Sequence, residues 1–185
     1  MRNLHALSLI LLVVVAGSLL LTVRATGVSS GSTTTIRLWD GCDPTTFDQV
    51  LGPGACLPGG HGQERFDTFI NEVTLDKIAG AWRYGSTKYE LSSGTATTLQ
   101  NRGGETHTFT KVAKFGGGVV PILNQLSGNP NPAPECLAPP SSTSTFVPGL
   151  KTLPGPMAGS AALPAGASKY QCCIHPWMRT VITVK

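Results

Sequence analysis

The chain has 185 residues, of which 41% are hydrophobic and only 13% are charged. This length fits a single domain with its own hydrophobic core. Its 14 Lys and Arg residues exceed its 10 Asp and Glu residues, but they form no cluster, which excludes nucleic acid as an expected partner.

The N-terminal segment has the pattern of an export signal. Arg2 precedes an uncharged apolar stretch, residues 6–23, and Val23-Arg24-Ala25 has small residues where a signal peptidase reads. We expect residues 1–25 to be a secretory signal peptide, with an uncleaved anchor, and therefore a membrane tether, as the alternative. In both cases the folded part is exported to the periplasm, the extracellular space or the cell surface.

The next segments predict a leader, a strand and a helix. Residues 26–34 are polar and without periodicity, which predicts a flexible leader before a single folded domain over 35–185. Residues 35–39 alternate like a strand. An insertion at about 42–78 contains one clear helical signal, because apolar residues recur at i, i+3, i+4 and i+7. These residues are Phe66, Phe69, Ile70 and Val73.

The remaining pattern is mainly β. Short strand-like segments separated by turn residues predict an all-β sandwich. We expect the strands at about 82–84, 89–91, 95–100, 106–112, 169–172 and 179–184. Residues 127–168 are rich in Pro and Gly, which predicts an irregular surface insertion with one internal strand at most.

Five cysteines in an exported chain leave at least one thiol outside intrachain disulfides. Cys42 and Cys56 enclose a short loop, and we expect a disulfide between them that contributes about 3 kcal/mol. Cys172 and Cys173 are neighbours whose side chains point to opposite faces of a strand, so Cys173 can pair with Cys136 while Cys172 stays free. A vicinal Cys172–Cys173 disulfide is the alternative.

The free cysteine belongs to a motif that is typical of a metal site. Cys172-x-x-His175-x-x-Met178 places a thiolate, an imidazole and a thioether on one tight loop. A second imidazole from elsewhere would complete a trigonal set of two histidines and a cysteine with a weak axial methionine. This ligand set favours copper and one-electron chemistry.

Two segments resemble the cupredoxins, the small blue-copper proteins. Tyr170-x-Cys172-x-x-His175-Pro-Trp-Met178-Arg179 is similar to their ligand loop, and Asn101-Arg-Gly-Gly-Glu-Thr-His107-Thr-Phe109 is similar to their first-histidine segment. The resemblance covers about residues 81–120 and 168–185. It implies a Greek-key β-sandwich that binds one copper ion. The equatorial ligands that it implies are His107, Cys172 and His175, and the axial ligand is Met178.

The resemblance also implies roles around the metal. In the family, the Asn before the first histidine ties the two ligand loops together, which makes Asn101 the candidate for this role. Pro176 has no backbone N–H, so the amide of Thr108 is the expected hydrogen-bond donor to the Cys172 sulfur. Trp177 resembles the exposed apolar rim through which cupredoxins meet redox partners, and a buried Trp is the alternative.

These features predict a one-electron carrier that cycles between Cu(I) and Cu(II) and meets redox partner proteins. Copper binding for delivery or storage is the alternative, because the same ligands permit it. We expect no enzyme activity, since the exported part has only three histidines, too few for a further copper centre. A zinc site with two cysteines and two histidines is a further alternative. Its ligands would be His107, Cys172, Cys173 and His175.

Overall fold

The computed structural model describes residues 32–137, 144–154 and 163–185. Contacts divide the chain into two units, 1–30 and 31–185, and all described residues lie in the second unit. The expected signal segment, 1–25, therefore lies outside the described residues. Within the described ranges, no helix has the length and apolar character needed to cross a membrane.

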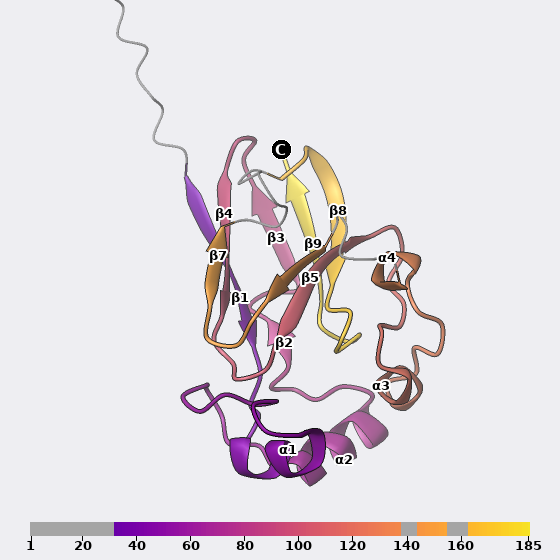
Figure 1. Cartoon of the computed structure of the whole chain (residues 1–185). Helices are drawn as coiled ribbons and strands as arrows, with labels where there is room; N and C mark the ends of the chain where they lie inside the picture. Colours follow the sequence, from indigo (N-terminus) through magenta and orange to yellow (C-terminus); the bar gives the residue numbers. More distant parts are fainter. Residues whose placement is uncertain (1–31, 138–143, 155–162) are drawn as a thin grey trace, which may run out of the picture. The chain divides into compact units, whose positions relative to one another are not determined.

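The described strands form two sheets (Figure 1). The four-stranded sheet has the order β2-β1-β4-β7 and consists of β1 (Thr33–Trp39), β2 (Arg83–Tyr84), β4 (Ala96–Asn101) and β7 (Thr152–Pro154). The five-stranded sheet has the order β3-β9-β8-β5-β6 and consists of β3 (Lys88–Leu91), β5 (His107–Val112), β6 (Ser144–Val147), β8 (Gly166–Gln171) and β9 (Arg179–Val184).

Strand alternation creates the core between the sheets. Along β4 and β9, every second side chain is buried, which is the pattern of a sheet with one face on a core. The β1–β4 and β3–β9 pairs are parallel, and the other pairs are antiparallel. The predicted all-β sandwich is therefore confirmed. Its most deeply buried large side chains include Ile36, Leu38, Leu99, Phe109, Tyr170 and Ile182.

Four short helices accompany the sheets in the described residues. They are α1 (Pro44–Leu51), α2 (Phe66–Asp76), α3 (Pro121–Leu126) and α4 (Pro134–Leu137). The prediction of α2 is confirmed, but the expectation of a single helix is wrong. The three unexpected helices all begin with proline, which suits the first turn of a helix because its missing N–H would have no partner there. In the sequence, Pro44 and Pro134 lie in segments expected to be irregular, and Pro121 lies in a segment to which no element was assigned.

Two other expectations need correction. The described part of the Pro-rich segment 127–168 contains the strands β6 and β7 and the start of β8, and β7 extends the four-stranded sheet beside β4. The expected leader, 26–34, is too long, because β1 already begins at Thr33, which pairs with Ala96. The strand signal of these threonines is weak, but hydrogen bonding to the neighbouring strand β4 stabilises them as part of β1.

The helices α1 and α2 lie together at one end of the sandwich (Figure 1). Asp43 caps α1, since its carboxylate accepts a hydrogen bond of 3.1 Å from the Thr45 amide. Phe69 of α2 packs on Trp82, with ring centroids 4.5 Å apart. The insertion 42–78 is therefore packed on the core, and it brings α2 beside the loop between β8 and β9.

Candidate metal centre

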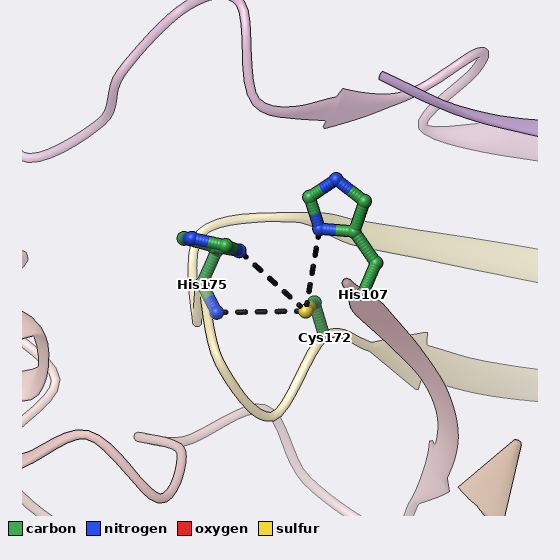
Figure 2. A group of neighbouring side chains, drawn as sticks. All are labelled: His107, Cys172 and His175. Atoms are coloured by element: carbon green, nitrogen blue, oxygen red, sulfur yellow. Dashed lines mark hydrogen bonds between the residues drawn. The ribbon is translucent and has the colours of Figure 1, made fainter. Parts of the chain in front are cut away.

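The structure brings three of the expected ligands together. His107 is the first residue of β5, while Cys172 and His175 lie on the loop between β8 and β9 (Figure 2). The Nδ1 atoms of His107 and His175 lie 4.0 and 3.9 Å from the Cys172 sulfur. One ligand atom from each residue lies within 4.8 Å of the others, and all three side chains are buried. A single ion between them would reach all three atoms.

Backbone hydrogen bonds close the ligand loop. The Cys172 amide donates to the Met178 carbonyl at 3.0 Å, and the Met178 amide donates to the His175 carbonyl at 2.9 Å. These two bonds fold the motif into a compact turn between two paired strands. Met178 is buried at the same end of the sandwich, but its axial role stays a prediction.

The sulfur of Cys172 has two backbone donors. The Thr108 amide lies 3.4 Å from it, as expected, and the His175 amide lies 3.5 Å from it. The expectation of a single donor was therefore incomplete. The absent N–H of Pro176 removes one donor, but the preceding residue supplies another because the loop turns tightly there. Hydrogen bonds to the sulfur stabilise the thiolate and withdraw charge from it.

Asn101 holds the first-histidine segment rather than the C-terminal loop. Its side-chain amide donates to the carbonyls of Glu105 at 2.7 Å and Val147 at 3.0 Å. The link between the two ligand segments is made instead by Thr108, whose hydroxyl accepts a bond of 2.7 Å from the Cys173 amide. Asn101 thus positions the approach to β5, and Thr108 joins β5 to the ligand loop.

Asp40 was not expected at the site. Its carboxylate is buried and accepts four hydrogen bonds, three from backbone amides and one of 2.9 Å from Nε2 of His107. Because Nε2 donates to Asp40, the other ring nitrogen, Nδ1, faces the sulfur and the position of an ion. Asp40 follows the last residue of β1, and the sequence carried no motif that linked it to His107.

Glu105 has the same relation to the second histidine. Its Oε2 lies 3.4 Å from Nε2 of His175 and accepts a hydrogen bond from the indole N–H of Trp82. Its own amide donates to Asp40 at 3.1 Å. Both histidines are therefore backed by carboxylates that belong to one hydrogen-bonded network. The only sequence signal was the position of Glu105, two residues before His107.

Two glycines make this network possible. A Cβ on Gly103 would lie only 1.8 Å from an Asp40 carboxylate oxygen, and a Cβ on Gly104 would lie 2.9 Å from both sulfurs of the Cys42–Cys56 disulfide. Such contacts are far inside van der Waals distance. The Gly-Gly pair in the first-histidine segment thus allows the backbone to wrap closely around Asp40.

The electrostatics of the cluster favour a thiolate. Burial alone would raise the pKa of the Cys172 thiol, but hydrogen bonds and charge from the two histidines hold it well below its usual range. Burial disfavours a charged His175, yet Glu105 and Cys172 outweigh this effect and raise its pKa to about 10. A cation bound between the ligands would be stabilised by the buried thiolate and by the carboxylates behind both histidines.

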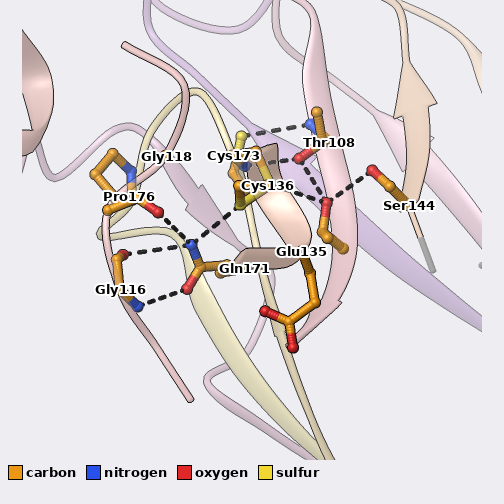
Figure 3. Close-up of a disulfide and its surroundings, with 12 residues drawn as sticks. Thr108, Gly116, Gly118, Glu135, Cys136, Ser144, Gln171, Cys173 and Pro176 are labelled. Atoms are coloured by element: carbon orange, nitrogen blue, oxygen red, sulfur yellow. Dashed lines mark hydrogen bonds between the residues drawn. A yellow bond between two sulfur atoms is a disulfide. The ribbon is translucent and has the colours of Figure 1, made fainter. Parts of the chain in front are cut away.

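The remaining cysteines form two disulfides. Cys42 pairs with Cys56, and Cys136 pairs with Cys173 (Figure 3), which leaves Cys172 as the free thiol. These are the pairs that the cysteine pattern predicts. The vicinal disulfide is excluded, and the zinc alternative fails because Cys173 has no thiolate to offer.

Aromatic rings cover the His175 side of the cluster. The ring of His175 lies 6.3 Å from both Phe69 and Trp82 and 5.6 Å from Trp177, measured between centroids. Trp177 is half-buried, so it is neither the exposed rim nor the fully buried residue of the two expectations. His175 itself is only 2% exposed.

The solved structures found to resemble the chain include several cupredoxins. A purple cupredoxin from Nitrosopumilus maritimus is 18% identical, with a TM-score of 0.39 over 58% of this chain and 87% of that chain. A reduced auracyanin from Roseiflexus castenholzii is 14% identical, with a TM-score of 0.39 over 84% and 98%. A reduced amicyanin variant is 18% identical, with a TM-score of 0.35 over 58% and 77%. No family model and no curated protein matches the chain.

Proposed function

Starting from a cupredoxin-like β-sandwich that buries one free thiol between two histidines, we propose that this chain is an exported type 1 copper protein that carries single electrons between redox partners. The observation that carries the proposal is the convergence of one ligand atom each from His107, Cys172 and His175 within 4.8 Å of one another, with Nδ1 of each histidine facing the sulfur. A thiolate with two imidazoles accommodates both Cu(I) and Cu(II), which is the chemistry that copper would supply here.

The protein's own residues prepare this site for rapid redox change. Asp40 and Glu105 fix the orientation of the two imidazoles, and two backbone amides orient the sulfur. Three ligands thus have hydrogen-bonded supports that stay in place whichever charge the ion carries. Little structural change between oxidation states favours fast electron transfer.

Burial of the site supports an electron carrier rather than a protein that delivers copper. All three ligand residues are at most 2% exposed, so a receiving protein could not contact them without a local opening of the fold. Two disulfides fit an oxidising, exported location.

The direct test is reconstitution of the purified protein with Cu(II). We expect an intense visible band from the thiolate–copper bond and a reversible one-electron wave in voltammetry. The matched pair of variants is Cys172→Ser, which should lose the band, and Ser168→Ala, which should keep it. A colourless, redox-silent wild-type protein contradicts the proposal, and rapid loss of Cu(I) to a chelator supports delivery instead.

A further inference from the structure

The outer face of the four-stranded sheet is cationic. In the second half of β1, Ile36 and Leu38 are buried, and Arg37 and Trp39 lie on the other face. The register of β2 places Arg83 beside Trp39. Arg102 follows β4 at the same end of the sheet. The four strands contain no Asp or Glu. We call Arg37, Trp39, Arg83 and Arg102 the arginine face.

Trp39 lies between two guanidinium groups. The Arg83 and Arg102 groups lie 5.7 and 5.9 Å from the centre of its ring, within the range of cation–π attraction. Arg102 also lies 2.9 Å from Nε2 of the exposed His61. Among the described residues, no ion pair neutralises an arginine of this face. The face therefore presents unpaired positive charge around a half-buried aromatic ring.

This face is connected to the candidate metal centre by bonds. Trp39 is followed directly by Asp40, and the carboxylate of Asp40 accepts the 2.9 Å hydrogen bond from His107. Electron tunnelling weakens steeply across empty space and much less along covalent and hydrogen bonds. The route from Trp39 through Asp40 to His107 crosses no gap between packed surfaces.

We propose that the arginine face is the docking surface for an acidic redox partner protein, and that the electron passes through Trp39, Asp40 and His107. Trp and Arg are the residue types enriched at the energetic centres of protein interfaces, and unpaired arginines steer an acidic partner to the face. One electron moves in each encounter, so one protein is oxidised and the other is reduced by one unit. The inference rests on the proposed electron-carrier function and adds the partner's charge and its place of contact.

The His175 side of the molecule is the competing surface. A cavity of about 180 Å³ there is lined mainly by apolar side chains and includes His175 and Glu105. Ile122 and Leu51 at this cavity are 57% and 54% exposed. A partner that docked there would be recognised by apolar contact, and salt would hardly affect the rate. Charge dependence therefore separates the two surfaces.

The test uses the copper-loaded, reduced full protein and the anionic oxidant hexacyanoferrate(III), with the rate followed by stopped flow. An Arg83→Gln/Arg102→Gln double variant should react about tenfold more slowly at low salt, and the difference should shrink at high salt. The control, Lys88→Gln/Lys114→Gln, removes the same charge from exposed positions outside the arginine face. It should slow the reaction less than about twofold.

Two further measurements test the route of the electron and the acidic character of the partner. Trp39→Leu keeps every charge of the face and should slow the reaction several-fold at all salt concentrations. A hexaglutamate peptide should compete with hexacyanoferrate in the wild type and in the control, but not in the arginine variant. All variants should keep the thiolate band and the potential, which shows that the copper centre is intact.

Equal rates in the two double variants overturn the inference, as does a slow reaction in Ile122→Ser while the arginine variant reacts normally. These outcomes differ from failure of the proposed function. In that case the wild-type protein would show no thiolate band and no reversible electron exchange, whichever surface was altered.

Discussion

Individual residues decide how strongly the site favours each oxidation state. The carboxylates of Asp40 and Glu105 place negative charge behind both imidazoles. Negative charge stabilises Cu(II) more than Cu(I), and it therefore lowers the reduction potential. The hydrogen bonds to the Cys172 sulfur act in the opposite direction, because they withdraw charge from the thiolate.

The first prediction concerns Asp40. Asp40→Asn removes one buried charge next to His107, so we expect the potential to rise by about 60 mV, which corresponds to a tenfold change in relative stability of the two states. Voltammetry of the copper-loaded protein measures it. Asp48→Asn is the control, because Asp48 is an acidic residue of α1 whose carboxylate accepts hydrogen bonds from the amides of Gly54 and Cys56 and makes no contact with either histidine. An equal rise in both variants would contradict the prediction.

The second prediction concerns Met178, which is 1% exposed. Met178→Leu keeps the volume of the side chain and removes the thioether. If the thioether is a weak axial ligand, the variant retains copper and its potential rises, because a donor to the metal is lost. A fall in potential, or loss of copper, is evidence against axial ligation. Metal analysis together with voltammetry distinguishes these results.

The third prediction concerns the pH dependence of stability through Glu64. Burial, and then the nearby charge of Glu72, raise the pKa of this carboxyl from 4.5 to about 7. One of its oxygens is buried without a hydrogen-bond partner. Because the folded-state pKa is raised, its stabilising contribution is complete below pH 4.5 and is lost as the pH rises through about 7.

Glu64→Gln removes this titration. Urea unfolding between pH 5 and pH 8 should show a decrease of stability in the wild type that is smaller in the variant. Glu72→Gln is a useful companion, because it should reduce the decrease only in part. Parallel stability curves for the wild type and Glu64→Gln would show that Glu64 does not titrate in this range.

Helices and strands position these residues, and the sequence predicted some of these elements and missed others. The helix α2 and the strand β9 were predicted because apolar residues recur regularly along them. The strand β5 was predicted from its β-favouring residues, and β8 was predicted only from Lys169 onward. The helices that begin at Pro44, Pro121 and Pro134 were missed, since proline marks both loops and first helical turns. The strand β7 has three residues and gains its stability from pairing with β4, which local sequence does not show.

In the candidate metal site, too, local sequence patterns predicted some residues, while contacts between distant segments were missed. Cys172 and His175 were predicted from their spacing on one short loop, whereas His107 was predicted from the resemblance of its segment to the first-histidine segment of the cupredoxins. Asp40 and Glu105 were missed as supports, since their contacts depend on how β1 ends beside the first-histidine segment. Long-range packing of this kind leaves no periodic signal in one sequence.

The fourth prediction concerns the link between α4 and the ligand loop. The Cys136–Cys173 disulfide joins residues 37 positions apart, and a closed loop of this length contributes about 4 kcal/mol by the chain-entropy estimate. Nearby, the buried Gln171 bonds to the backbone of Gly116 at 3.0 Å, so the disulfide and this amide hold the same region (Figure 3). We therefore expect the disulfide to support stability and not metal binding.

In a Cys136→Ser/Cys173→Ser variant, the free energy of unfolding should fall by about 2–5 kcal/mol, as measured with urea. The thiolate–copper band should persist under native conditions. The matched control is Cys172→Ser, which should lose the band while the two disulfides remain. Loss of the band in the double variant, with the fold intact, would mean that the roles of Cys172 and Cys173 are exchanged.

At the scale of the whole molecule, the candidate metal centre joins elements that are distant in the chain. Its ligands and their supports come from the end of β1, from β5 and its approach, and from the loop before β9. An ion that binds all of them in the folded state, and not in the unfolded chain, stabilises the entire sandwich. Binding of the metal and the stability of the fold are therefore linked.

The fifth prediction follows from this linkage. Removal of copper should lower the thermal midpoint, and free copper at 100 times its dissociation constant should add about 2.7 kcal/mol of stability. Calorimetry of the metal-free and copper-loaded protein measures the effect, and Cys172→Ser serves as the control in which added copper should give little change. A midpoint independent of copper in the wild type would show that the ion does not bind the folded site.

The Cys42–Cys56 disulfide makes the reduction potential of the proposed copper centre sensitive to thiols and other reductants. The Cys42 amide lies 3.3 Å from Asp40, and the bridge packs against Gly104, whose amide also bonds Asp40. A strong reductant that opens this bridge would loosen the Asp40 carboxylate behind His107 while leaving every proposed copper ligand in place. Opening of the Cys42–Cys56 bridge would thus alter the driving force for electron exchange, although the bridge supplies no ligand to the metal.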